Sequence, residues 1–519
     1  MTRFPFRNFL TLTVLSVFVA ASQAGALTAD EVWADWQLRA EEAGAPITAA
    51  TRREGDRLVV TGIEIPVGPV DDRDVLRLSR IDLQDRPDGT VALLLPPSFP
   101  IVVNKSLPRE AGEIEVITLT ASAPGFSMII AGLGEQADYD LSAPSLVISL
   151  ASVVPALGPG ESADFNLALA DFALRHRMDL TAPTQTVAST LRLGTLHFDA
   201  KVDIPGDKQT FAFTIDLAAV AAAFDAVIPP SAQRQPEPGE EPTIAALLTT
   251  MSDGLSIGAS LSHDGISVKV DGQTEAELPF ALEVSSASLK GATKLDRDVF
   301  DYDLTIGRTA LKTTVDDPEI GVPEIEMSVA EYSGRLSFGI GNLTDPQEAR
   351  LTFRLIDLTL PPAIWAEVDP TGLFPATPIS FAIDLTGGYA LGPEMLEPGW
   401  EPQPDVFPPM DIVGLTLQEL LVSGFGVTVK GDGTLTFDES DLTTFAGVPA
   451  PEGRIGLEAT GVYSLIDRVA EAGLVPPEQL TPLRLGLAFI GKAGEAPDSL
   501  VSAIEFRDKS FYLNGQKLR

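Results

Sequence analysis

The sequence predicts a mainly β protein with a few short helices, built on long curved antiparallel sheets. Three observations support this class. Apolar and polar residues alternate with a period of two in many segments, short turns rich in Gly, Asp and Pro separate these segments, and helical periodicity is sparse. Because a flat open sheet of more than about ten strands curls, splits or closes, we expect a curved sheet with one apolar side. That side would form an open apolar groove unless helices fill it.

The alternation predicts strands with one buried side and one solvent-exposed side. In "FGVTVKGDGTLTFD" we expect two paired strands joined by a turn at Gly431-Asp432-Gly433, and at the C-terminus Asn514-Gly515 predicts a hairpin turn because both central residues of a type I′ turn need positive φ. The segments with the clearest alternation are 59–67, 196–204, 211–217, 266–270, 300–306 and 427–437.

The N-terminal segment resembles a secretory signal peptide. Arg3 and Arg7 precede an apolar run from Phe9 to Ala21, and Ala24-Gly25-Ala26 fits a small-residue cleavage site. We therefore expect cleavage near Ala26 and a periplasmic location. The apolar run is shorter than the roughly 20 residues of a spanning helix, and we expect no transmembrane segment in the mature chain.

Helices are expected at a few places only. Thr28 and Glu31 have the spacing of a capping box, and Trp33 and Trp36 lie on one face of the helix that follows, which we expect to dock on the sheet. Further helical periodicity is found at 217–227, 244–251, around 364–365 and at 464–472, where Gly473 fits the position after a helix end.

The predicted organisation has four parts. They are a signal peptide at 1–26, an N-terminal β-rich part with a leading helix at 27–228, a flexible linker at 229–242 and a C-terminal β-rich part at 243–519. The linker is rich in Pro, Glu and Gln without apolar periodicity. A second Pro-rich segment, 391–411, contains Met, Leu, Trp and Phe, and we expect it to be extended and packed. The sequence leaves open whether the two β-rich parts form one continuous sheet.

Composition limits the function. The chain has 519 residues, no cysteine and a net charge of −37. Without cysteine there can be no disulfide, thiol catalysis or iron–sulfur cluster. A strongly negative field repels nucleic acid, so we expect no nucleic-acid partner.

Residues that could carry chemistry occur in patterns that favour structural roles. "GLSIG" places Ser256 in the pattern of a nucleophile elbow, but a turn and a strand follow where the elbow needs a helix. The histidines His176, His197 and His263 lack metal-ligand spacing, and we expect them at the surface.

Two acidic clusters, Asp296 to Asp303 and Asp71 to Asp74, lack the frame of a calcium loop. Alternation places Asp301 and Asp303 on the solvent side of a strand. The sequence thus predicts no catalytic, cofactor-binding or metal site and no cofactor, and we expect a protein that is not an enzyme.

A resemblance to a known family lies mainly in the last hundred residues. These run "VTVKGDGTLTFDES", "GRIGLEATGVYSLIDRVAEAGLVPPEQL" and "IEFRDKSFYLNGQKL". This layout resembles the exported bacterial family called domain of unknown function 2125, and "ALTADEVWADWQ" is similar to openings in that family. More distantly it resembles the AsmA-like envelope proteins. That resemblance implies an elongated β-rich groove connected with lipid handling and outer-membrane assembly, and it implies no catalytic residue.

Two functions remain open from the sequence. The first is a non-enzymatic periplasmic envelope protein whose curved sheet binds or shields lipid or another apolar ligand. The alternative is a structural or interaction protein of the cell envelope with a packed core and no ligand. The expected partner is accordingly lipid or an envelope protein.

Overall fold

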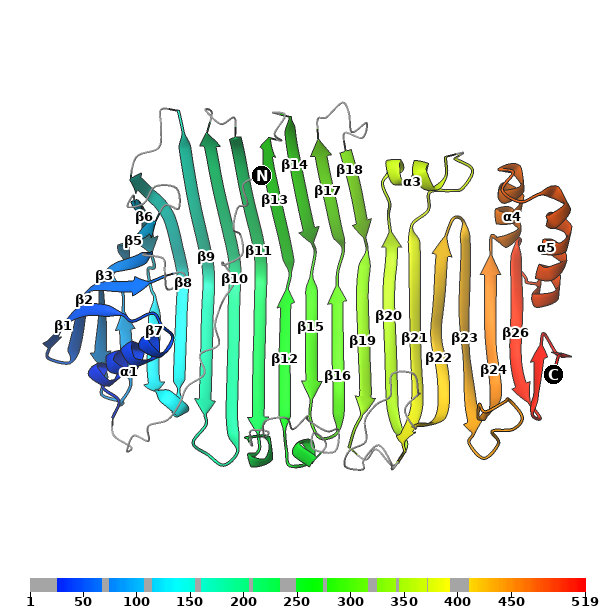
Figure 1. Cartoon of the computed structure of the whole chain (residues 1–519), viewed down its shortest axis with the longest axis horizontal. Coiled ribbons are helices and arrows are strands. Elements are labelled where there is room, and N and C mark those ends of the chain that lie inside the picture. The colour runs from blue at the N-terminus through cyan, green and yellow to red at the C-terminus, as the bar shows by residue number, and fades with distance from the viewer. Residues whose placement is uncertain are drawn as a thin grey trace. The chain divides into compact units, whose positions relative to one another are not determined.

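The computed structural model describes residues 26–67, 74–106, 114–154, 160–204, 209–233, 249–273, 278–315, 324–341, 345–370, 372–392 and 410–519. These residues contain 28 strands, all assigned to one antiparallel sheet, together with a few short helices (Figure 1). The mainly β class predicted from the sequence is confirmed. The chain divides into two compact units. Unit 1 contains Met1–Leu146, Leu150–Ala156 and Ala173–Val187, and unit 2 contains Val147–Ser149, Leu157–Phe172 and Ala188–Arg519.

Unit 1 consists of one helix and a set of short strands. Strand β3 pairs with β2 along one edge and with both β4 and β5 along the other. Strands β8 (Asp138–Val154), β9 (Ser162–Asp179) and β10 (Gln185–Ile204) contribute residues to both units. The other elements of unit 1 are α1 (Ala29–Glu42), β1 (Thr48–Glu54), β2 (Arg57–Pro66), β3 (Val75–Asp85), β4 (Val91–Leu94), β5 (Ser98–Ser106), β6 (Ile114–Ser122), β7 (Ser127–Gly132) and the 3-10 turn Gly134–Gln136.

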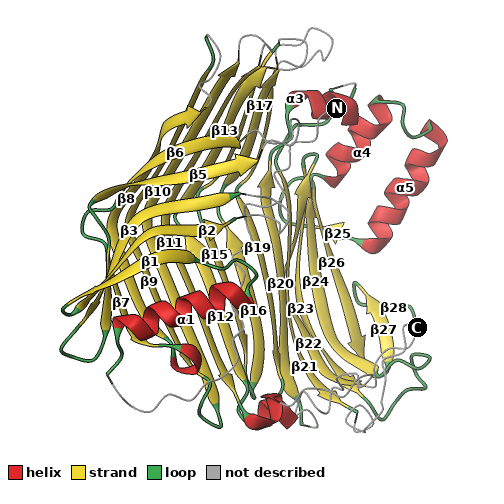
Figure 2. Ribbon diagram, turned by 60° about the vertical axis from the view of Figure 1, so that its left-hand side comes forward, coloured by secondary structure: helices red, strands yellow, loops and turns green. Residues whose placement is uncertain are grey.

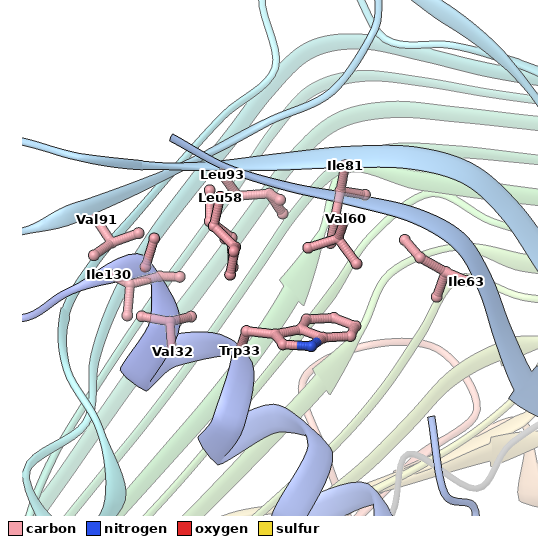
Figure 3. Packing of buried hydrophobic residues seen from close by; sticks show 11 residues of the cluster. Val32, Trp33, Leu58, Val60, Ile63, Ile81, Val91, Leu93 and Ile130 are labelled. Carbon is pink, nitrogen blue, oxygen red and sulfur yellow. The ribbon is translucent and has the colours of Figure 1, made fainter. Parts of the chain in front are cut away.

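Helix α1 begins at the predicted capping box. The Thr28 hydroxyl accepts a hydrogen bond from the Glu31 amide, and the Glu31 carboxylate accepts one from the Thr28 amide at 2.9 Å. Val32 and Trp33 are buried against the strands, and Trp36 packs beside them, so the predicted docking of this helix is confirmed (Figure 3). The buried cluster comprises Ala29, Val32, Trp33, Leu58, Val60, Ile63, Ile81, Leu83, Val91, Leu93 and Ile130.

Unit 2 is dominated by strands that pair in an antiparallel ladder. Strand β11 pairs with β13 through its first half and with β12 through its second half. Its strands from β11 on are β11 (Gln209–Ile228), β12 (Ser256–His263), β13 (Gly265–Gln273), β14 (Pro279–Ser286), β15 (Leu289–Leu295), β16 (Val299–Ile306), β17 (Thr309–Val315), β18 (Glu324–Val329), β19 (Glu331–Gly339), β20 (Gln347–Leu358), β21 (Ile379–Leu391), β22 (Met410–Gly424), β23 (Val427–Asp438), β24 (Ala450–Thr460), β25 (Lys492–Ala493), β26 (Ser499–Arg507), β27 (Ser510–Leu513) and β28 (Gln516–Lys517). Its helices include α3 (Pro362–Val368), α4 (Val462–Glu471), α5 (Pro477–Ile490) and the 3-10 turn Pro230–Gln233.

A line of interruptions crosses the middle of this ladder. It separates β12 from β13, β14 from β15, β16 from β17 and β18 from β19, so each pair forms two consecutive halves of a longer run. Ala219 and Asp357 lie on the same line in β11 and β20 and have φ values of 49° and 53°. Left-handed residues of this kind are typical of bulges, which locally bend a strand without ending its pairing.

The helix predicted at 217–227 is wrong. "LAAVAAAFDAV" is instead the second half of β11, where Ala221 to Val227 pair residue by residue with β12. Alanine favours a helix by only a few tenths of a kcal/mol per residue over most residues, and pairing along the strand overrides that preference.

The turn predicted at Gly431-Asp432-Gly433 is also wrong. Strand β23 runs straight through it, and Gly431 and Gly433 pair with Leu457 and Ile455 of β24. A Cβ on Gly433 would lie 2.4 Å from the Arg454 carbonyl oxygen, so this glycine permits a close approach of strands.

Several other expectations are confirmed. Helices occur at Pro362–Val368 and Val462–Glu471, and Gly473 follows the second with a φ of 69°. Asn514 and Gly515 have φ values of 52° and 82° between β27 and β28, as the type I′ turn requires.

Other predictions fall wholly or partly outside the described residues. These are the signal peptide, most of the linker at 229–242, most of the 391–411 segment and the first part of the helix at 244–251, of which 249–252 are helical. The predicted four-part division stays a prediction.

The docking of α1 leads to a first test. Trp33→Ala should destabilise unit 1 by about 3–5 kcal/mol, because truncating a buried Trp loses its burial energy and leaves a cavity. Hydrogen exchange of the amides in β2, β3 and β4 would report the loss of protection. Leu38→Ala is the matched control, since Leu38 on the same helix is 55% exposed. Equal protection in both variants would contradict the docking.

The close approach at Gly433 leads to a second test. Gly433→Ala should lower the free energy of unfolding by about 1–3 kcal/mol, because its Cβ overlaps the backbone of β24. Gly456→Ala is the control on the facing strand, where the nearest atom to a new Cβ lies 3.8 Å away. Urea denaturation of both variants measures the difference. A Gly433→Ala variant as stable as the control would instead favour a turn at this position.

Candidate functional site

The register of unit 2 aligns apolar side chains in continuous rows. Residues directly opposite each other on neighbouring strands project from the same face of a sheet, so the pairing itself defines these rows. We call the face that carries them the apolar face. One row follows Phe224, Ala259, Thr293, Tyr302, Leu336, Leu351, Leu385, Leu417, Gly433, Ile455, Ile504 and Leu513. The neighbouring row follows Ala226, Ile257, Leu295, Phe300, Phe338, Ala349, Gly387, Leu415, Leu435, Gly453, Phe506 and Phe511.

The apolar face stays open to solvent over much of its extent. Leu261, Leu336 and Leu351 are 49%, 41% and 46% exposed. Aromatic rings within the face contact one another, as in the stacked pair Phe300–Phe338, whose centroids are 4.9 Å apart. Large exposed apolar patches mark sites of interaction, whereas scattered single residues do not, and here the exposed residues are contiguous through the register.

The opposite face, which we call the polar face, is crossed by ion pairs. Its rows include the run from Ser260 through Ala292, Asp303, Arg335, Thr352 and Asp384 to Glu419. Arg335 pairs with Asp301 at 3.1 Å and Arg350 with Asp384 at 2.7 Å, while Arg354 pairs with Glu419. Each exposed ion pair of this kind contributes little to the stability of the fold. Together the charged groups keep this face hydrated, so an apolar partner would bind the opposite face.

A shallow hollow lies on the polar face over β21, β22 and β23. Its volume is ≈ 490 Å³, and the paired residues Gly388 and Gly414 are among those that line it. Its lining includes the hydroxyl groups of Thr386, Thr416, Thr434 and Thr436. A separate hollow of ≈ 280 Å³ in unit 1 is lined by Arg177, Asp138 and their neighbours.

Ser256 and His263 stand at the two ends of β12. Seven residue steps along the extended strand separate their Cα atoms by roughly 23 Å, so they do not converge. Ser256 pairs with Val227 and is followed by a strand, as predicted for a residue outside a nucleophile elbow. The His263 Nδ1 atom is buried without a hydrogen-bond partner among the described residues.

The two other histidines lie on neighbouring strands, β9 and β10. His176 packs near Tyr139 with ring centroids 6.4 Å apart. His197 lies between two carboxylates: its Nδ1 is 2.7 Å from Asp216 and its Nε2 3.2 Å from Asp199. The hydrogen bond with Asp216, followed by the charges of both carboxylates, raises the pKa of His197 above its ordinary value of 6.5.

The acidic cluster at Asp296 to Asp303 is divided between a turn and a strand. The contact with Lys294 at 2.6 Å lowers the pKa of Asp296, and the hydrogen bonds that Asp296 accepts from the amides of Asp298 and Val299 lower it further. Asp301 and Asp303 lie on the polar face, as predicted. Among the described residues no group of three or more His, Cys, Asp or Glu side chains has a metal-binding arrangement. Asp71 and Asp72 lie outside these residues.

Helix α5 was missed by the sequence reasoning. Its sequence "PEQLTPLRLGLAFI" contains two prolines and a glycine, which conceal its helical character. Leu485 and Phe489 on this helix are 67% and 53% exposed. The signal that could have revealed it is the apolar spacing of Leu480, Leu483, Leu487 and Ile490.

The fold and the site together define a β-sheet protein with one apolar and one ion-paired face. Residues 264–518 match the family described as uncharacterized protein conserved in bacteria (DUF2125), and this part of the chain belongs to that family. The match begins beside the interruption between β12 and β13 and includes α4 and α5, whereas α1 and the opening segment lie outside it. No curated protein and no solved structure matches the chain.

Within the described part of the chain, every helix is too short or too polar to cross a membrane.

The pair of carboxylates around His197 leads to a third test. The imidazole of His197 should titrate above 6.5, and Asp216→Asn should lower its midpoint, because the largest stabilising contact of the charged ring is lost. Proton–carbon NMR can follow each ring, since the chain has only three histidines. A raised folded-state pKa stabilises the fold below pH 6.5, and this contribution disappears as the pH rises through the folded value. A midpoint that Asp216→Asn leaves unchanged would contradict the pairing.

Proposed function

We propose that the protein is a non-enzymatic periplasmic protein of the cell envelope that binds or shields acyl lipid on the apolar face of unit 2. The observation that carries the proposal is the open, contiguous apolar face with its aligned rows. Export rests on the signal-like N-terminal segment, and the distant resemblance to AsmA-like proteins is in keeping with lipid handling. In this proposal the ligand is held by burial of its hydrocarbon, and no group of the protein reacts with it.

The energetics favour a flexible apolar ligand. Burying apolar surface contributes about 25 cal/mol per Å², which is about 0.8 kcal/mol for each methylene group of an acyl chain. An acyl chain lying along a row could cover the half-exposed side chains of Leu336, Leu351 and Tyr302 together. The ion pairs on the polar face disfavour the same ligand there, because it would remove charged groups from water without replacing their contacts.

The rows also offer recesses between large side chains. Leu261, Gly291, Leu304, Gly334 and Phe353 lie opposite one another in consecutive strands, so side chains alternate with glycines. A Cβ on Gly334 would meet only the Thr352 carbonyl oxygen, at 3.8 Å, and the space above this glycine is open. Recesses of this kind suit a thin, unbranched chain better than a rigid ring system.

A matched pair of variants tests the proposal. Leu261→Glu should weaken binding of a fluorescent fatty-acid probe by about tenfold, since a buried leucine contributes about 1.5–3 kcal/mol and 1.4 kcal/mol is a factor of ten. Ser260→Glu adds the same charge one residue away on the exposed polar face and should leave the affinity unchanged.

Lipid extraction of the purified protein, followed by mass spectrometry, supplies a second measurement. Absence of bound lipid together with absence of probe binding would sink the proposal. That result would favour the alternative of an envelope interaction protein without a ligand.

A further inference from the structure

The exposed side chains of α5 surround the helix on all sides. At 100° per residue, Leu483 and Ile490 project from one side, and Leu485 and Phe489 project from the opposite side. Each of these four side chains is at least 42% exposed. A helix that is apolar all round is normally buried in a protein core or in a membrane, yet among the described residues these side chains of α5 stay exposed.

Few charged residues lie within the apolar surface of α5. Glu478 and Arg484 are its only charged residues, and Arg484 pairs with Asp467 of α4. Leu474, in the connection between α4 and α5, extends the exposed apolar surface. A groove on a protein partner would cover one side of the helix and leave the other in water. A lipid surface can surround all sides, so the circumferential pattern selects lipid over protein.

The C-terminal end of α5 is fixed to the sheet beside the apolar face. The hydroxyl of Ser502 and the side-chain amide of Asn514 both donate to the Ile490 carbonyl oxygen, at 2.6 and 3.0 Å. Ser502 pairs with Leu457, which projects from the same side of β24 as Ile455 of the apolar rows. Gly491 packs closely on Leu500, where a Cβ would lie 3.3 Å away from the leucine Cβ. The helix is therefore held to the sheet at its C-terminal end and contacts α4 through Arg484 (Figure 2), and most of its other side chains are exposed.

The geometry points to α5 as an element that inserts into the surface of an uncharged lipid bilayer. Its 14 residues are about 21 Å long, which is shorter than the roughly 30 Å hydrocarbon core. The helix is therefore too short to span the bilayer, and we expect it to lie along the plane of one leaflet. With its net charge of −37, the chain would be repelled by anionic headgroups but not by zwitterionic headgroups. We therefore expect α5 to bind a zwitterionic bilayer better than an anionic one. This membrane contact is separate from acyl binding by the apolar face and does not depend on it.

Flotation with phosphatidylcholine vesicles tests the inference on residues 27–519. The double variant Leu485→Glu/Phe489→Glu should partition into vesicles at least tenfold less than the unchanged chain. Both side chains already lie in solvent, so folding should be retained, and circular dichroism and the unfolding midpoint check this. Each protein is purified after removal of residues 1–26, so the N-terminal apolar run does not contribute to flotation.

Two controls separate this inference from the proposed function. Leu261→Glu should float as the unchanged chain does, and Leu485→Glu/Phe489→Glu should bind the monomeric fatty-acid probe with unchanged affinity. Phe489→Trp should show quenching by brominated lipid, whereas Ser260→Trp, on the exposed polar face, should not. Vesicles with phosphatidylglycerol should bind less at low salt, with the difference disappearing at high salt.

Equal flotation of the unchanged chain and the double variant would overturn the inference, as would a Trp at 489 that brominated lipid does not quench. Size-exclusion chromatography with light scattering tests whether a second copy of the chain binds α5 instead of lipid. A mass that falls from dimer to monomer in the double variant, without vesicle binding by the unchanged chain, would assign α5 to contact with a second copy and would also overturn the inference.

Discussion

The cross-strand register of unit 2 is the constraint on which the other features depend. Side chains alternate with a period of two, so a slip of one residue between neighbouring strands would mix the apolar rows with the ion pairs. The register is instead maintained from β11 to β27, and Tyr302, Leu336 and Leu351 meet across consecutive strands. Where the ladder needs an extra residue, as at Gln418 between the pairs of Glu419 and Leu417, a bulge absorbs it and the rows continue beyond it.

Glycine has a different role inside this ladder from the one it has in turns. Gly433 and Gly453 allow backbones to approach where any Cβ would overlap a carbonyl oxygen, whereas Gly334 leaves an open recess in an apolar row. Gly515 is needed for its positive φ of 82° in a hairpin, and Gly453 also has a positive φ, of 141°. Glycine thus allows strands to approach closely, leaves a recess in the face, or allows the chain to reverse in a turn. The role at each position depends on the atoms that a Cβ there would contact.

The two units differ in how far their apolar side chains are buried. In unit 1, α1 places Val32 and Trp33 over short strands and forms a closed cluster. In unit 2 the apolar rows are half-exposed, and α5 presents further apolar side chains to solvent. Exposed hydrocarbon of this extent costs free energy unless something covers it, which is why the lipid proposals concern unit 2 and not unit 1.

The sequence by itself determined the strand class, the capping box at Thr28 and the hairpin at Asn514-Gly515, because each depends on residues close together in the chain. It also placed Asp301 and Asp303 on the polar side through alternation alone. Only the tertiary structure decided that 217–227 is a strand, that Gly433 lies within one, and that Leu261 shares a face with Phe353. Those outcomes depend on strand partners farther along the chain, such as Ile266 for Leu217 and Ile455 for Gly433, and local propensity carries no information about which strand will supply the hydrogen bonds.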